Sequence, residues 1–103
     1  MIQWTQNISR TKTVQYHTKE TLLMATYLAI DIGASSGRHI IGRIRDGVIE
    51  EKEIYRFTNG AKEVNGHLIW DIEHLFDEIV NGLRTAGELG MAPDYIGIDT
   101  WGV

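Results

Sequence analysis

The sequence predicts an α/β domain in which three strands, one helix and a fourth strand follow one another (β-β-β-α-β) and build a mixed sheet. Two segments of the same design, 27–32 and 95–100, alternate aliphatic residues with other residues and carry an aspartate near the end. A helical pattern separates them. A helix between two strands favours a right-handed crossover, so strand 95–100 is expected to run parallel to strand 27–32.

The first strand, 27–32, has aliphatic residues on both faces, as in a sheet that is covered on both sides. Residues 33–37 are expected to form a turn, because two glycines and two serines follow the apolar run directly. Residues 38–45 then form a second strand, in which Gly42 indicates a bulge or a close approach of another group.

Asp46-Gly47 predicts a tight hairpin, since both turn positions tolerate positive φ. The third strand, 48–57, has the charged middle Glu-Glu-Lys-Glu, which suits an exposed sheet edge because charge discourages further pairing. Residues 58–67 are expected to form a loop.

Asp71 is a good N-cap for a helix over residues 72–89. Gly90 ends this helix and Pro93 prevents its continuation. One apolar stripe is expected to face the sheet: Ile72, Leu75, Phe76, Ile79, Val80 and Leu83.

Composition places the chain among ordinary soluble globular proteins. Its 103 residues are 43% hydrophobic and 23% charged, and the net charge of −4 gives no support to a nucleic-acid partner. There is no Cys, which excludes disulfides and thiolate metal sites. Without a disulfide framework, the expected compartment is the cytoplasm. No apolar run approaches the ~20 residues of a membrane span.

Residues 1–23 differ from the rest, being polar and without sustained periodicity. A signal peptide is disfavoured, because the apolar run that follows the basic residues leads into Asp31 without a small-residue cleavage site. We expect the native protein to start at Met24, with 1–23 as a non-native or disordered leader: Lys19-Glu20 can be encoded by a purine-rich ribosome-binding sequence. Sequencing the amino terminus of the protein expressed from its native gene tests this expectation.

Asp31 and Asp99 are the main candidates for chemistry. If their strands are parallel neighbours, both carboxylates lie at the carboxyl end of the sheet, where open α/β sheets bind ligands. Two carboxylates there suit a hydrated Mg²⁺. The adjacent turn offers backbone N–H groups, Ser hydroxyls and Arg38, which suit phosphate oxygens. It is neither a Walker loop nor a dinucleotide fingerprint, because it lacks the lysine and a strand follows it.

The other candidates are histidines and tryptophans. The four histidines, at positions 17, 39, 67 and 74, have no metal-ligand spacing. Trp70 is expected to fasten the helix to the sheet. Trp101 is either a core aromatic or an apolar wall for a small ligand.

The motifs "AIDIGASSGR" and "GIDTWGV", with a hairpin, "NG", "WD" and a helix between them, resemble the amino terminus of the rhamnulokinases, within the FGGY family of carbohydrate kinases. The resemblance runs from about residue 27 to the end. It implies a ribonuclease-H-like, actin-type ATPase fold, with 24–103 as the first, truncated part of the amino-terminal domain.

The same resemblance implies the roles of individual residues. The ATP phosphates would be lined by Ala34, Ser35, Ser36, Gly37 and Arg38. Asp31 would face Mg²⁺ through water and Gly102, after Trp101, would touch the sugar. The family reaction is transfer of the γ-phosphoryl of ATP to the 1-hydroxyl of L-rhamnulose. The catalytic base and the adenosine pocket would lie downstream, so this chain alone is expected to be an inactive fragment.

Three alternatives stay open. A ribonuclease-H-like nuclease also places acidic residues on its first and fourth strands for two-metal hydrolysis, but it needs further carboxylates and a basic face. The protein is alternatively another FGGY sugar kinase, or a remnant that binds nothing. A second domain with another phosphate turn would favour the kinase.

Overall fold

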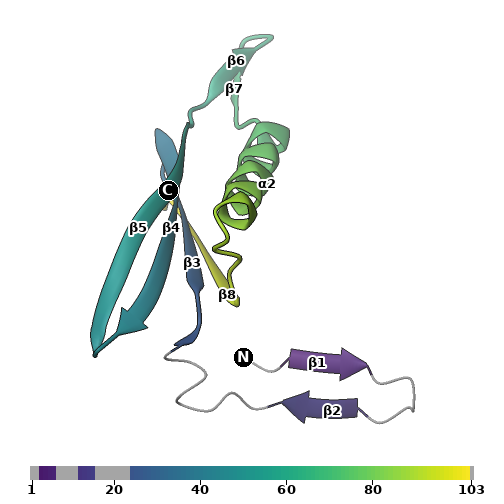
Figure 1. The fold of residues 1–103 in the computed structure, drawn as a ribbon. Coiled ribbons are helices and arrows are strands. Elements are labelled where there is room, and N and C mark those ends of the chain that lie inside the picture. Colours follow the sequence, from purple (N-terminus) through teal and green to yellow (C-terminus); the bar gives the residue numbers. More distant parts are fainter. Residues whose placement is uncertain (1–2, 7–11, 16–23, 103) are drawn as a thin grey trace.

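The computed structural model describes residues 3–6, 12–15 and 24–102 (Figure 1). Strands β1 (Gln3–Gln6) and β2 (Lys12–Gln15) pair antiparallel as a separate two-stranded sheet. The rest of segment 1–23 lies outside the described residues, and its assignment as a leader stays a prediction.

A four-stranded mixed sheet forms the centre of the structure (Figure 1). Its order is β5 (Val48–Thr58), β4 (Ser36–Arg45), β3 (Tyr27–Ile32) and β8 (Tyr95–Thr100). Strands β3, β4 and β5 are antiparallel neighbours, and β8 runs parallel to β3. The predicted α/β class, mixed sheet and parallel pairing are confirmed.

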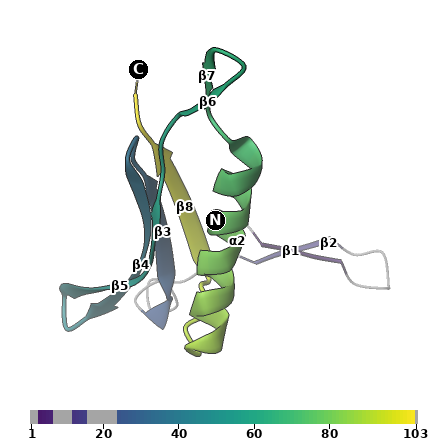
Figure 2. The ribbon, with the colours of Figure 1, turned by 90° about the horizontal axis from the view of Figure 1, so that it is seen from above.

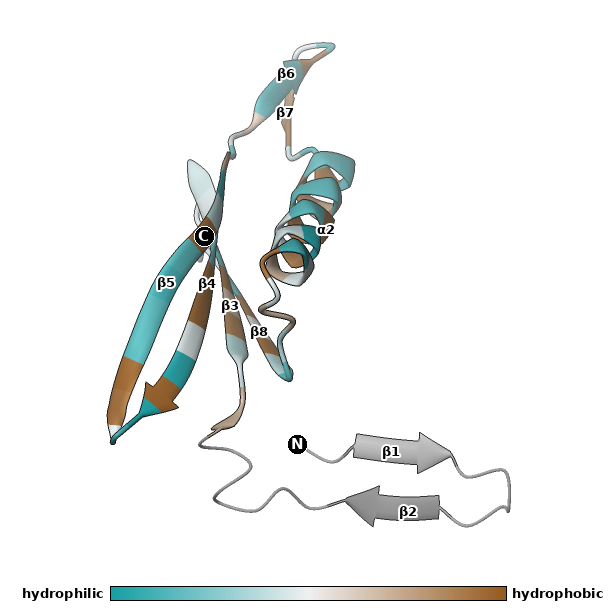
Figure 3. Ribbon diagram, in the orientation of Figure 1, coloured by the Kyte–Doolittle hydropathy of each residue, from teal (hydrophilic) through white to brown (hydrophobic). Residues whose placement is uncertain are grey.

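The hairpin between β4 and β5 forms as predicted, with positive φ at both Asp46 (51°) and Gly47 (76°). Strand β5 is the sheet edge and its charged middle is exposed, as expected (Figure 3). The prediction for Gly42 is wrong: the register shift lies between His39 and Ile40, and nothing approaches within 4 Å of a Cβ built at Gly42.

The turn after β3 is shorter than predicted, because Ser36 and Gly37 already belong to β4. Gly37 pairs with Phe57 of β5, and a Cβ at Gly37 would overlap the Phe57 ring. The glycine is therefore needed for a close approach within the sheet, which extends the ladder into the segment expected to turn.

Residues 58–67 are not simply a loop. Strands β6 (Lys62–Val64) and β7 (His67–Ile69) form a small hairpin through Asn65 and Gly66, with φ of 51° and 80°. Asn-Gly is the same kind of signal as Asp46-Gly47, but the flanking strands have only three residues each and show little alternation.

Helix α2 (Ile72–Glu88) begins as predicted at Asp71, whose Oδ1 accepts a hydrogen bond from the His74 N–H at 2.9 Å. This hydrogen bond is the main cause that holds the pKa of Asp71 below its ordinary value. A hydrogen bond from Lys62 to the same carboxylate is the second cause. The helix ends before Gly90, which has φ of 69° and donates its N–H to the Gly87 carbonyl at 3.0 Å.

The core lies between α2 and the face of the sheet that carries Leu28, Ile30 and Ile32. At Gly82 the helix approaches so closely that a Cβ would overlap the fully buried His39 ring. Burial lowers the pKa of His39, and its Nε2 lies 3.2 Å from the Ile79 carbonyl oxygen, which accepts its hydrogen bond. This histidine is therefore a neutral core residue.

The predicted helix stripe is only partly buried. Leu75 is in the core, and Ile79 and Leu83 pack against it, but Ile72 and Phe76 are 69% and 64% exposed. The reason is the position of the helix, which packs mainly against β5 and β4. Figure 2 shows α2 along one face of the sheet. Its Glu78 accepts a hydrogen bond from Tyr55 of β5 at 3.1 Å.

The exposed side of the predicted helix stripe, with Ile72 and Phe76, therefore lies toward β8. There Ile96 and Ile98, which share the helix-facing side of the sheet, are also exposed.

Candidate functional site

The two predicted aspartates meet at the carboxyl edge of β3 and β8. Asp31 and Asp99 are register partners in the parallel pair, so both side chains leave the same face of the sheet, opposite α2. They line one end of an open depression of about 620 Å³ on that face. The proximity expected from the two "ID" motifs is confirmed for the backbone.

Asp31 is held by Arg38, its register partner on the other side. Arg38 Nε donates to Asp31 Oδ2 at 3.1 Å, and the two side chains are each 45% exposed. An ion pair this accessible is weak, so an incoming phosphate can compete for the guanidinium and a cation for the carboxylate. The pair therefore keeps both groups at the edge without burying either.

The turn between β3 and β4 presents unpaired amide groups. It is closed by the Gly33 N–H, which donates to the Ser36 carbonyl at 2.8 Å. Within the described chain, the N–H groups of Ala34 and Ser35 donate no hydrogen bond to another residue, and both residues are exposed. Successive free N–H groups beside the exposed Ser35 hydroxyl form a suitable cradle for an anion.

Residues of the predicted phosphate set differ in accessibility. Ala34, Ser35 and Arg38 are exposed, Ser36 is half-buried, and Gly37 is buried beneath Phe57. Ala34, Ser35 and Arg38 are therefore the residues of this set that a ligand can contact most readily.

The donor set at this edge fits a hydrated Mg²⁺. Two carboxylates on adjacent strands are enough for an ion that usually keeps several waters and takes its other ligands from phosphate. In the part of the chain that the structure describes, no three His, Asp or Glu side chains gather into a metal-binding cluster.

An aromatic pair lies beside this edge. Trp101, immediately after β8, packs partly against the core and lies against Trp70, with ring centroids 4.3 Å apart and planes tilted by 45°. Trp70 thus contacts the segment after β8, whereas the sequence indicated only a contact that fastens the helix. Gly102 is exposed and has free space around it.

Sequence reasoning gave Asn59 no role of its own, yet it makes two hydrogen bonds to the turn between β3 and β4. Its backbone N–H donates to the Ser35 carbonyl at 2.9 Å, and its Nδ2 donates to the Gly33 carbonyl at 2.8 Å. The sequence signal was a single Asn after a strand, which is common in ordinary loops.

The three histidines in the described part of the chain have other positions in the fold. His39 is in the core, His67 is exposed in β7, and His74 Nε2 lies 3.2 Å from the Thr58 carbonyl oxygen. His17 lies outside the described residues.

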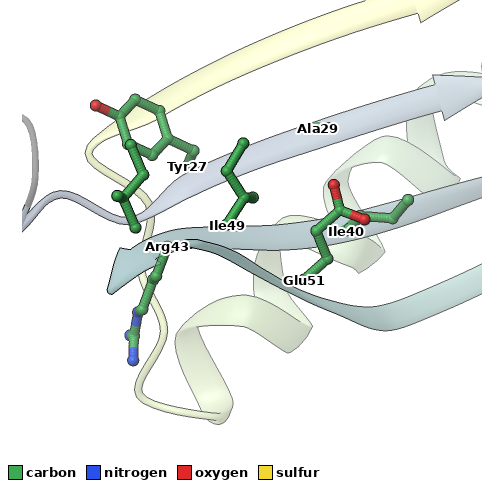
Figure 4. A pocket seen from close by; sticks show the side chains of 8 residues that line it. Tyr27, Ala29, Ile40, Arg43, Ile49 and Glu51 are labelled. Atoms are coloured by element: carbon green, nitrogen blue, oxygen red, sulfur yellow. The ribbon is translucent and has the colours of Figure 1, made fainter. Parts of the chain in front are cut away.

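A second depression, of about 300 Å³, lies on the same face, opposite α2, toward the start of β3 (Figure 4). Its lining is mainly apolar, with Tyr27, Ile40 and Ile49. None of the predicted site residues lines it. Among the described helices, none is long and apolar enough to cross a membrane.

Comparison with known proteins gives one consistent result. No family model matches the chain. Proteins named rhamnulokinase do match it. The rhamnulokinase of Bacillus subtilis (strain 168) is 47% identical over 77 residues, which are 75% of this chain and 16% of the relative. Those of Lactiplantibacillus plantarum and Halalkalibacterium halodurans are 45% and 50% identical over 78% and 74% of this chain, again 16% of each relative. The chain thus spans about a sixth of the length of these proteins.

Proposed function

We propose that this chain, which is similar to rhamnulokinases over about three quarters of its residues, forms the first part of the amino-terminal domain of an ATP-dependent kinase. The full-length protein phosphorylates L-rhamnulose on its 1-hydroxyl. The observation that carries the proposal is this 43–50% identity to several rhamnulokinases. The paired aspartates and the open turn at one sheet edge supply matching chemistry.

In this proposal the turn binds the ATP phosphates. The free N–H groups of Ala34 and Ser35 and the Ser hydroxyls donate to phosphate oxygens, and Arg38 neutralises part of their charge. The turn is held by hydrogen bonds of Gly33 with Ser36 and Asn59. Little reorganisation then accompanies the charge shift of phosphoryl transfer.

Asp31 and Asp99 would hold Mg²⁺, and the bound ion would supply positive charge that offsets the charge of the transferring phosphoryl group. Trp101 and Gly102 border the sugar, since an aromatic face gives an apolar wall next to the polar edge. The base that accepts the hydroxyl proton comes from the part of the kinase outside this chain. A cytoplasmic location belongs to the proposal, because ATP is the phosphoryl donor.

The test is ADP formation by the full-length protein with Mg-ATP and L-rhamnulose, followed by a coupled assay. We expect sugar-dependent ADP release that is faster with L-rhamnulose than with other ketoses or glycerol, and a product phosphorylated at carbon 1. Preference for a different sugar would mean another FGGY kinase.

Two further arms separate the alternatives. Metal-dependent cleavage of nucleic acid, without sugar-dependent ADP release, would support the nuclease. A protein that binds neither Mg-ADP nor sugar would be a remnant, and the proposal would be wrong.

A further inference from the structure

Asn59 holds the phosphate turn from outside the strands that it connects. The turn lies between β3 and β4, whereas Asn59 follows the end of β5. Its backbone bond to Ser35 continues the β4–β5 ladder by one step beyond the Ser36–Thr58 pair. Any residue with a backbone N–H can make that bond.

The side-chain bond is specific to the amide. Asn59 Nδ2 donates to the Gly33 carbonyl at 2.8 Å, and the side chain is half-buried. The Gly33 N–H is already occupied by the Ser36 carbonyl, and a Cβ at Gly33 would lie only 2.9 Å from that oxygen. Both polar backbone groups of Gly33 are therefore fixed, which sets the direction in which the next two N–H groups point.

The neighbouring residue connects this bond to the helix. The Thr58 carbonyl accepts the hydrogen bond of His74 Nε2 at 3.2 Å, and His74 lies in the first turn of α2. The Phe57 ring packs edge-on against His74, with centroids 6.4 Å apart. The segment that leads into Asn59 is therefore held by the helix, through His74, and by the turn, through Ser35.

We propose that Asn59 is a positioning residue for nucleotide binding: by donating to the Gly33 carbonyl it holds the free N–H groups of Ala34 and Ser35 toward the phosphates. This inference rests on the proposed function. If Asn59 had only a structural role, its replacement would lower the stability of the protein alone. If it positions the turn, its replacement weakens the affinity for nucleotide phosphates and leaves the sugar site unchanged.

The experiment compares Asn59→Ala and Asn59→Asp with the parent full-length protein. Asn59→Ala is expected to weaken Mg-ADP binding, measured by calorimetry, about five- to tenfold, the size of one ordinary hydrogen bond. The KM for ATP should rise by a similar factor, with the sugar KM unchanged. Asn59→Asp keeps the shape but places a carboxylate against the Gly33 carbonyl and near the phosphates, so its loss should be larger.

Asn81→Ala is the matched control, because it removes an amide hydrogen bond to Glu78 on α2, away from the turn. It should leave Mg-ADP affinity unchanged. Nucleotide affinity unchanged in both Asn59 variants, or sugar and ATP KM raised together, would overturn the inference.

The readouts separate this inference from the proposed function. A parent that binds Mg-ADP with Asn59-dependent affinity but does not phosphorylate L-rhamnulose would support the positioning role and refute the substrate. A parent that binds no Mg-ADP would refute both.

Discussion

Replacing Asp31 by asparagine in the full-length protein should separate the proposed role of this residue in phosphoryl transfer from its role in stability. The change removes the carboxylate that pairs with Arg38 and keeps the volume of the side chain. We expect a large fall in kcat, a small change in sugar KM and nearly unchanged stability. The reason is that alignment of metal and phosphate matters chiefly in the transition state.

The structure sets the two magnitudes. Both members of the Asp31–Arg38 pair are 45% exposed, so its loss should cost less than about 1 kcal/mol of unfolding free energy. Loss of a group that stabilises charge in the transition state lowers kcat by about 10²–10³-fold, or roughly 2.7–4 kcal/mol. The effect on activity should therefore exceed the effect on stability severalfold.

Glu50→Gln is the matched control. It removes the Arg45–Glu50 ion pair, which has an N–O distance of 3.5 Å and side chains 67% and 53% exposed, at the far end of the β4–β5 hairpin. Coupled ADP assays over a range of sugar and Mg-ATP concentrations, together with thermal melts, compare the two variants. If Asp31→Asn retains kcat within a few fold of the parent, or only raises the sugar KM, the assignment of Asp31 is wrong.

Three further predictions use the same protein or the chain alone. Trp101→Ala should raise the L-rhamnulose KM and spare Mg-ADP binding; unchanged sugar kinetics would make Trp101 a core residue only. Gly82→Ala should lower the melting temperature, because overlap with His39 costs about 1–3 kcal/mol against a helix-propensity gain of about 1 kcal/mol. Gly87→Ala, with free space around it in the same helix, should raise the melting temperature, so shifts of equal sign would contradict the packing argument. The isolated 103-residue chain should aggregate or bind a hydrophobic dye, because Ile96, Ile98 and Phe76 are exposed. It should form no ADP, because the base proposed for the reaction lies outside this chain; a cooperative monomeric melt with sugar-dependent ADP release would refute both expectations.

The fold was predictable where local signals agreed with one another. Asp46-Gly47, the Asp71 cap and the two "ID" strands each combine a periodic pattern with a clear boundary residue, and the structure forms them at nearly the expected residues. The extension of β4 to Ser36 was not predictable, because it depends on Phe57 covering Gly37. The sequence pattern of one strand does not show which side chain of a neighbouring strand packs against it.

The same distinction applies to the helix and the site. Ile72 and Phe76 fit the helical period as well as Leu75 does, and only the position of α2 over β4 and β5 decides which of them is buried. The proximity of Asp31 and Asp99 followed from the parallel crossover alone. The bond from Asn59 to Gly33 joins residues 26 positions apart, and no spacing rule indicates it.

The pairing of β8 with β3 has a consequence for the order in which the chain acquires structure. Thr26 and Asp94, just before these strands, are joined by two hydrogen bonds. The Thr26 N–H donates to Asp94 Oδ2, and the Asp94 N–H donates to the Thr26 carbonyl, both at 2.8 Å. They are 68 residues apart in sequence, whereas β3, β4 and β5 are joined by short turns. Closing the long loop carries the larger entropy cost, so we expect the three-stranded meander to form first. Until synthesis has passed residue 100, one edge of β3 has no partner, and the nascent chain is then most open to pairing with another strand.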